Sequence, residues 1–162
     1  MSTDHSAEWK ALLDRFTTAI VANDGAGLAA CFTPEGTYSD YIYGDFTGPD
    51  EIAHLLNRYF HGDGRDYKWD MIDPVSDGKT GYARYLFSFT STMPEYAGNR
   101  VVLEGTTVAK LQDGLIAHYH ETADAICAMA QLGLPADVMY RRGQKNAKAL
   151  LAREESQPHK AG

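Results

Sequence analysis

The chain has 162 residues and a net charge of −7, and these values exclude several kinds of protein. This length suits one ordinary domain rather than two, and it lets the chain fold without disulfides or a structural metal. An acidic chain is poorly suited to nonspecific nucleic-acid binding, which needs clustered Lys and Arg. No segment approaches the run of about 18 apolar residues that crosses a membrane, and the N-terminus lacks the basic and apolar regions of a secretory signal. We therefore expect one cytoplasmic domain over residues 1–162, with neither nucleic acid nor membrane as a partner.

Cysteine, histidine and glycine patterns bear on cofactors. Cys31 and Cys127 stand in apolar contexts outside any CxxC spacing, which predicts free, buried thiols. His118 and His120, with Asp124, imitate part of a metal-binding set, because side chains at i and i+2 of a strand can chelate one ion. The third ligand strand is missing from the pattern, and so are phosphate loops, dinucleotide fingerprints and nucleophile motifs. We expect neither a metal nor a cofactor.

The first half of the chain predicts two helices, one strand and a third helix. Apolar residues at helical spacing predict a first helix that ends at 23–25, with Ser6 or Thr3 as its N-cap. Its buried stripe is Trp9, Leu12, Leu13, Phe16 and Ile20. A short helix over 26–32 and a strand over 37–43 follow, because the latter residues alternate and favour β-structure. Pro49 marks the start of the third helix.

Four long strands and a terminal helix are predicted for the second half. Segments 66–75, 81–92, 99–111 and 115–122 are rich in β-formers and are separated by turn signals. Consecutive strands of this kind favour a curved antiparallel sheet. A helix over 137–155, interrupted at Gly143, precedes a frayed tail. We interpret its basic residues as a solvated helix face: Arg141, Arg142, Lys145 and Lys148.

This order predicts an α+β fold in which a cystatin-like curved antiparallel sheet forms a cone around three helices (α-α-β-α-β-β-β-β), with an extra C-terminal helix. Four motifs then occur in the order found in the nuclear transport factor 2-like superfamily, which includes SnoaL-like cyclases and ketosteroid isomerase: ANDGAGLAACFTPEGTYSDYIYG, GDFTGPDEI, DGLIAHYHETAD and QLGLP. The chain resembles this superfamily over residues 9–134. The resemblance implies a single SnoaL-like domain with its core at 6–134, a helix and tail at 135–162, an enclosed pocket, and a homodimer formed through the outer sheet face.

The resemblance also implies two catalytic carboxylates. Asp40 stands where ketosteroid isomerase keeps a catalytic Asp, and Glu121 stands close to an acid/base Asp of SnoaL-like cyclases. Phe16 occupies the place of the isomerase's hydrogen-bonding Tyr, so that mechanism cannot be copied directly. The residues themselves leave two interpretations of Asp40 open. It is either a pocket base, whose pKa rises among apolar and aromatic neighbours, or a strand-end Asp that caps a turn amide.

The last strand presents two alternative faces. Tyr119 and Glu121 share one face, and His118 and His120 share the other. The family register directs Tyr119 and Glu121 inward, whereas a slip of one residue would reverse the assignment. The residues expected to bind substrate are aromatic: Tyr38, Tyr43, Tyr59, Trp69, Tyr85, Phe87 and Tyr119.

Together these features favour a cofactor-independent enzyme of the isomerase, cyclase or dehydratase type. Its pocket carboxylates would perform acid/base chemistry on a hydrophobic small molecule that bears a carbonyl or hydroxyl group. The alternative is a non-catalytic ligand-binding or dimerisation module, because fold does not determine function. A closed pocket holding a carboxylate of raised pKa favours the enzyme, whereas a collapsed cone with a large exposed apolar sheet favours the module.

Overall fold

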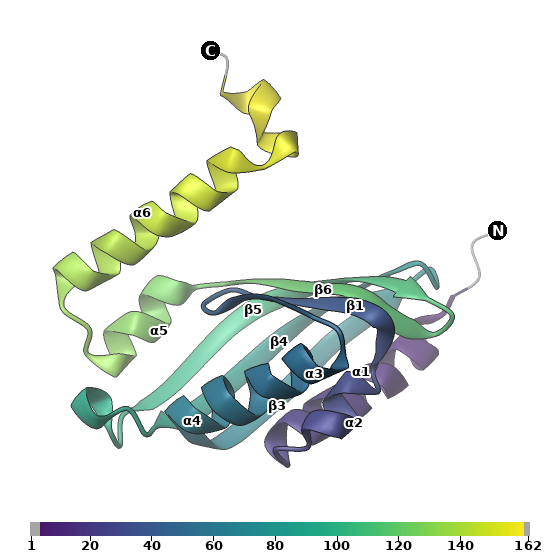
Figure 1. Cartoon of the computed structure of the whole chain (residues 1–162), viewed down its shortest axis with the longest axis horizontal. Helices are drawn as coiled ribbons and strands as arrows, with labels where there is room; N and C mark the ends of the chain where they lie inside the picture. The colour runs from purple at the N-terminus through teal and green to yellow at the C-terminus, as the bar shows by residue number, and fades with distance from the viewer. Residues whose placement is uncertain (1–3, 161–162) are drawn as a thin grey trace.

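The computed structural model describes residues 4–160, and its centre is a six-stranded sheet bent around a layer of helices (Figure 1). The strands, in the spatial order β2-β1-β6-β5-β4-β3, are β1 (Phe32–Asp40), β2 (Gly44–Thr47), β3 (Gly64–Ser76), β4 (Thr80–Ser91), β5 (Arg100–Gln112) and β6 (Leu115–Ala123). The helices under the sheet are α1 (Ser6–Val21), α2 (Gly25–Ala29), α3 (Pro49–His54), a π-helical turn (Leu55–Phe60) and α4 (His61–Asp63). This architecture confirms the predicted α+β fold.

Helix α1 lies in the hollow of the sheet because one of its faces is apolar. The whole predicted stripe is buried: Trp9, Leu12, Leu13, Phe16 and Ile20. The Trp9 indole donates a hydrogen bond to the carbonyl of Tyr82 at 3.1 Å. Gly81 makes this contact possible, because a Cβ there would lie 2.6 Å from the Trp9 ring. The helix begins at Ser6 with His5 as its N-cap, and Thr3, the other predicted cap, lies outside the described residues.

The sheet is mixed, which corrects the prediction of a wholly antiparallel one. Strands β1 and β6 pair in parallel, with Tyr38 opposite Tyr119, while the other four pairings are antiparallel. Strand β1 is distant in the chain from its neighbour β6. Local sequence patterns do not encode which distant strands become neighbours, so this parallel pairing could not be predicted from them.

The predicted strand over 37–43 is in fact one arm of a hairpin. Strand β1 already starts at Phe32, which shortens the preceding helix α2, and it ends at Asp40. A turn then leads into β2, which returns antiparallel to β1 and pairs Gly44 with Asp40. Gly44 has a φ of 104°, a conformation that glycine adopts without strain.

Helix α5 (Ala125–Leu132) was missed by the sequence analysis. It starts at Asp124, whose side chain accepts a hydrogen bond from the Cys127 amide at 3.0 Å, and it ends at Gly133 with a φ of 83°. The Gln131 side chain donates to the Val102 carbonyl at 2.7 Å and accepts from the Val102 amide at 2.9 Å. The helix thus covers the backbone edge of that part of β5 which extends past the end of β6. Cys127 is free but exposed, contrary to the prediction of a buried thiol, because it lies on the outer side of this helix.

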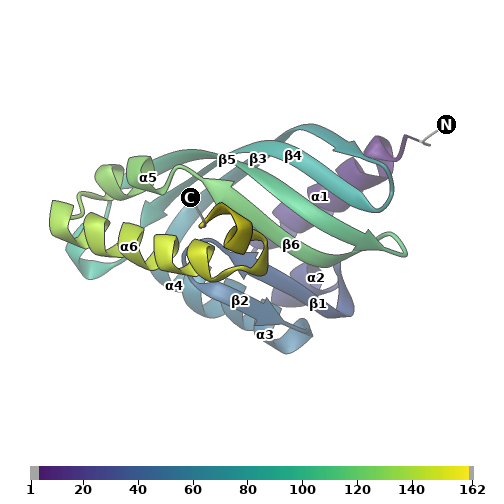
Figure 2. The same ribbon diagram turned by 90° about the horizontal axis from the view of Figure 1, so that it is seen from above.

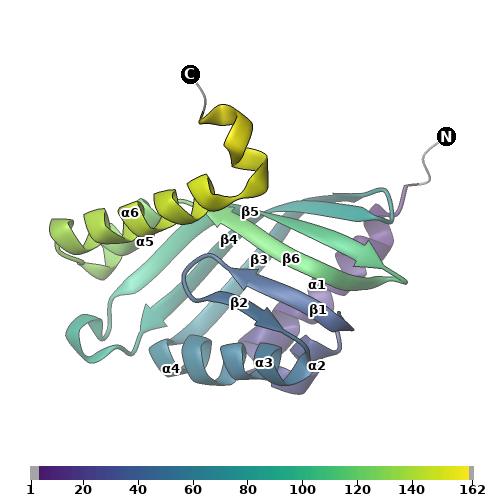
Figure 3. The same ribbon diagram turned by 45° about the horizontal axis from the view of Figure 1, so that its top comes forward.

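Helix α6 (Ala136–Ala152) lies on the opposite side of the sheet from α1 and is raised away from it (Figures 1 and 3). None of its residues is buried. It passes through Gly143 without interruption, since one glycine costs only about 1 kcal/mol in a helix of otherwise favourable residues. Residues Glu154–His159 then form a short 3-10 helix in place of the predicted frayed tail, visible above the sheet in Figure 2. Within residues 4–160, no helix is long and apolar enough to cross a membrane.

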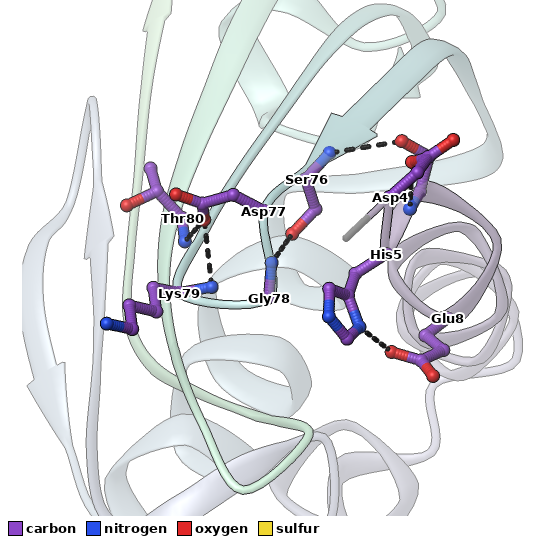
Figure 4. Close-up of polar contacts among 9 residues, drawn as sticks. Asp4, His5, Glu8, Ser76, Asp77, Gly78, Lys79 and Thr80 are labelled. Carbon is purple, nitrogen blue, oxygen red and sulfur yellow. Dashed lines mark hydrogen bonds and ion pairs between the residues drawn. The ribbon is translucent and has the colours of Figure 1, made fainter. Parts of the chain in front are cut away.

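The β3–β4 turn closes the end of the sheet nearest the N-terminus (Figure 4). The Asp77 carboxylate accepts from the amides of Thr80 at 2.8 Å and Lys79 at 2.9 Å, which lowers its pKa. The Ser76 hydroxyl accepts from the Gly78 amide at 3.0 Å, and His5 donates its backbone N–H to the Ser76 carbonyl at 3.2 Å. The start of α1 is therefore tied to this turn.

Deleting residues 136–162 is expected to change the free energy of unfolding by no more than about 1 kcal/mol, because no α6 side chain is buried. Urea denaturation followed by circular dichroism measures this. The matched control removes 125–162 and with it the Gln131 contacts to Val102 and the buried Ala128, so a clearly larger loss is expected. If the protein that lacks only residues 136–162 no longer unfolded cooperatively, this would contradict a core that ends near residue 134.

Candidate functional site

The parallel pairing of β1 with β6 brings the two candidate carboxylates together. Tyr38 lies opposite Tyr119, with their ring centroids 4.7 Å apart. Side chains on one face of a strand recur every second residue, so the next inward positions are Asp40 and Glu121. The two carboxyl groups are therefore neighbours at the end of β1, close enough for the charge of Asp40 to raise the pKa of Glu121.

Both carboxyl groups line one cavity of about 210 Å³. Four of the aromatic residues expected to bind substrate also line it: Tyr43, Trp69, Tyr85 and Phe87. The other three do not. Tyr38 and Tyr119 are fully buried behind the wall, where they pack on Phe16, and Tyr59 packs against Tyr43 with centroids 5.0 Å apart.

The cavity also contains polar groups that sequence reasoning missed. Asp63, at the end of α4, accepts a hydrogen bond from the Tyr43 hydroxyl at 2.8 Å, and Tyr67 donates to the Phe60 carbonyl. The outer part of the wall comes from α5 and α6, including Met129 and Arg142. Asp63 lies between the predicted third helix and the predicted strand over 66–75, Tyr67 lies within that strand, and no local signal places α5 or α6 beside the cavity.

Asp40 satisfies both interpretations that its sequence context left open. Its Oδ1 accepts the amides of Ile42 at 2.8 Å and Tyr43 at 2.7 Å, so it does cap a turn. The side chain also lies beside the cavity, and burial raises its pKa to about 6 although the two amide hydrogen bonds lower it. The turn therefore orients the carboxyl group while the cavity makes it a stronger base.

Glu121 is the more perturbed of the two acids. Burial and, second, the charge of Asp40 raise its pKa to about 8, which the hydroxyls of Tyr85 and Tyr119 oppose by hydrogen bonding. The Tyr119 hydroxyl lies 3.5 Å from Oε2. At neutral pH Asp40 is thus mainly ionised and Glu121 mainly protonated. Two carboxyl groups in different protonation states can serve as base and acid in one site.

A glycine lets Tyr85 reach Glu121. Gly105 on β5 lies opposite both Tyr85 on β4 and Ala123 on β6. A Cβ at position 105 would overlap the phenol of Tyr85 and would lie 2.7 Å from the Thr122 carbonyl. The absence of this side chain leaves the path from β4 to β6 open for the Tyr85 ring.

The histidines of β6 occupy the opposite face, as the family register implies. His118 is hydrogen bonded to the Ser39 hydroxyl at 2.8 Å, and its ring centroid lies 5.6 Å from that of His120. Burial and the neighbouring His118 lower the pKa of His120. Among residues 4–160, no three His, Cys, Asp or Glu side chains are grouped as metal ligands would be.

Gly105→Ala is expected to destabilise the protein by about 1–3 kcal/mol, because the added methyl group must displace the Tyr85 ring. Urea denaturation measures the loss. Gly143→Ala is the control: its Cβ would meet no atom within 4 Å and it lies in a helix, so this variant should be slightly more stable than wild type. Equal stability of the Gly105→Ala variant and wild type would contradict the packing described.

Glu121→Gln is expected to be stabilising at alkaline pH. The folded-state pKa of about 8 exceeds the ordinary value of 4.5, so the stability linked to this proton is present in acid and is lost as pH rises through about 8. Relative to wild type, the variant should gain at least about 1 kcal/mol between pH 5 and pH 9, or roughly 2–4 °C in Tm. The exposed Glu104, paired with Arg84 at 3.3 Å, supplies the control Glu104→Gln, which should lack this pH dependence. A pH-independent difference between the Glu121→Gln variant and wild type would refute the buried-acid assignment.

Solved structures of similar fold share most of the chain. A ketosteroid isomerase-like fold protein from Catenulispora acidiphila, in complex with trimethylamine, has a TM-score of 0.70 and 18% identity, over 78% of this chain and 95% of that one. An LEH-like epoxide hydrolase from M. tuberculosis has a TM-score of 0.63 and 18% identity, over 79% of this chain and 91% of that one. A putative polyketide cyclase from Xanthomonas campestris has a TM-score of 0.64 and 19% identity, over 79% and 98%.

These likenesses establish the fold, since all three identities are below 25%. No curated protein sequence matches the chain. Residues 13–119, which include β1, Asp40 and most of β6, match the SnoaL-like domain family. The sequence match and the nuclear transport factor 2-like neighbours agree, and the chain belongs to the SnoaL-like domain family.

Proposed function

We propose that this protein is a cofactor-independent enzyme that moves protons on a hydrophobic small molecule bearing a carbonyl or hydroxyl group. The observation that carries the proposal is the pair of adjacent carboxyl groups, Asp40 and Glu121, in one largely apolar cavity. Their pKa values of about 6 and about 8 support the role of base for Asp40 and of acid for Glu121 at neutral pH. Isomerisation, aldol-type cyclisation and dehydration all begin with the proton transfer that such a pair performs.

The proposed first step uses both groups at once. Two amides hold Oδ1 of Asp40, which leaves the carboxylate oriented to remove a proton from the carbon next to a substrate carbonyl. The electron pair of that C–H bond moves toward the carbonyl oxygen, and protonated Glu121 donates a hydrogen bond or its proton to this oxygen. Tyr85 positions Glu121 through its hydroxyl. Protonated Asp40 then returns the proton to another carbon of the enol, the enol carbon attacks a second carbonyl, or the enol expels a hydroxyl group that leaves as water with the proton from Asp40.

Phe16 explains why Glu121 carries the acid role in this proposal. A phenylalanine at that position stacks on Tyr38 with centroids 5.7 Å apart and supplies no hydrogen-bond donor. A donor for the developing oxygen charge must then come from another part of the wall. Glu121 is the protonated acid beside Asp40. The names of the epoxide hydrolase and polyketide cyclase neighbours place enzymes among proteins of this fold, which supports a catalytic role over a purely structural one.

Deuterium exchange of 2-tetralone in D₂O tests the proposal with an apolar ketone that needs no identified substrate. Wild-type protein should accelerate loss of the α-proton signal in NMR, and Asp40→Asn should reduce the catalysed rate by about 100-fold or more, because the base is lost. The Glu121→Gln variant should lose less, since an amide still donates a hydrogen bond. The pH profile should rise through about 6 and fall through about 8.

The control for this experiment is Asp45→Asn, which changes an acidic residue of β2 outside the cavity lining and should leave the rate unchanged. Exchange at the wild-type rate in a protein carrying both Asp40→Asn and Glu121→Gln would reject acid/base catalysis. It would favour the alternative, a non-catalytic ligand-binding module.

We retain the predicted homodimer through the outer sheet face as part of this proposal. Tyr82, Leu86 and Val102 lie on that face and are 47%, 38% and 48% exposed. Strands β4 and β5 place them near one another, and exposed apolar side chains grouped on one surface support an association site.

A further inference from the structure

Helix α6 brings a polar face to the outer end of the cavity. Arg142, Lys145 and Asn146 line it, and their spacing of three and four residues places them on one side of the helix. Arg142 and Lys145 are exposed and Asn146 is partly buried, so they form the mouth of the cavity rather than its floor. The family match ends at residue 119, so this mouth is built from a segment outside the matched region.

Some cations of the C-terminal segment are paired with acidic side chains, whereas those at the mouth, like Lys148 outside the cavity wall, have no ion pair among residues 4–160. Arg141 is paired with Asp137 at 2.7 Å, and Arg153 with Glu155 at 3.6 Å. Among residues 4–160, neither Arg142 nor Lys145 has an acidic group within ion-pair distance. Two unpaired cations and an amide on one helical face can contact an anionic group together, and a guanidinium matches a carboxylate in bidentate geometry.

The cavity therefore has two chemically different ends. The inner end holds Asp40 and Glu121, and the middle is apolar, with Phe87, Leu103 and Met129 in its wall. The cavity's acidic residues, Asp40 and Asp63, disfavour a negatively charged group beside them, and the apolar wall would desolvate it, but it would meet opposite charge at the mouth. Charge alone thus selects one orientation for an elongated ligand with one anionic end.

We propose that the ligand of this cavity is an amphipathic acid whose carboxylate is held at the mouth by Arg142, Lys145 and Asn146 while its apolar body fills the middle. This orientation directs the end remote from the carboxylate toward Asp40 and Glu121. The identity of the reacting end rests on the proposed function, whereas the preference for an acid does not. The basic face of α6 is then a specificity element rather than the solvated surface that its sequence predicts.

Isothermal titration of the full chain with 2-naphthylacetate and its uncharged amide, 2-naphthylacetamide, tests this at pH 7 and low salt. Wild type should bind the acid at least about 10-fold more tightly, as charge-assisted hydrogen bonds imply, and added salt should reduce the difference. A protein carrying R142Q and K145Q should bind both compounds within about twofold of each other. The matched control carries R141Q and K148Q, which remove the same charge from residues outside the cavity wall, and should keep the preference.

The possible results separate this inference from the proposed function. The inference is overturned if wild type binds the acid and the amide equally. It is also overturned if the protein carrying R142Q and K145Q still prefers the acid. The acid preference depends on Arg142 and Lys145 at the mouth and not on the reacting end of the cavity. If wild type prefers the acid but Asp40→Asn does not slow the proton exchange of 2-tetralone, only the catalytic proposal is rejected. Failure of wild type to bind either naphthalene would contradict the cavity as the ligand site and both proposals with it.

Discussion

The contact of Phe16 with the paired rings of Tyr38 and Tyr119 is the interaction on which the rest of the site depends. The three side chains are fully buried, and the Phe16 ring lies 5.7 Å from that of Tyr38 and 4.8 Å from that of Tyr119. This contact packs α1 against the concave face of the sheet and stabilises the register between β1 and β6. Because the side-chain period of a strand is two, a slip of one residue would turn Glu121 outward and bring His120 in.

This arrangement carries a cost in stability. The Tyr38 hydroxyl and the Trp69 indole nitrogen are buried without a hydrogen-bond partner among residues 4–160, and such a group costs about 1–3 kcal/mol. Burial of Asp40 and Glu121 adds a further penalty whenever either is ionised. The surrounding core, from Trp9 to Ile116, holds these groups in place. Polar groups retained at such a cost beside a cavity are typical of a functional site.

Residues that follow the matched family region complete the cavity. Helix α5 follows the end of β6 and forms hydrogen bonds with the free edge of β5 through Gln131. Its Met129 is part of the cavity wall. Helix α6 then adds charge at the mouth through Arg142 and Lys145. At the inner end Asp40 lies within the matched region and Glu121 two residues after it, and the C-terminal segment provides the outer end.

Much of this protein was predictable from local patterns. The spacing of Trp9 to Ile20 defined α1, turn residues separated the four long strands, and ordered motifs indicated the family. The family resemblance indicated Asp40 and Glu121 as candidates, and period-two alternation assigned the strand face of each. These features depend on residues within a few positions of one another, which is why the amino-acid sequence alone determined them.

The tertiary structure alone decided which distant segments of the chain are in contact. Tyr38 and Tyr119 are far apart in the chain, and only the parallel pairing of β1 with β6 makes Asp40 and Glu121 neighbours. The same packing buried Tyr38 and Tyr119 behind the cavity wall, left Tyr59 outside the lining, and brought Arg142 and Lys145 to the mouth. Each of these placements depends on contacts between distant segments, and the raised pKa values of Asp40 and Glu121 arise from those contacts.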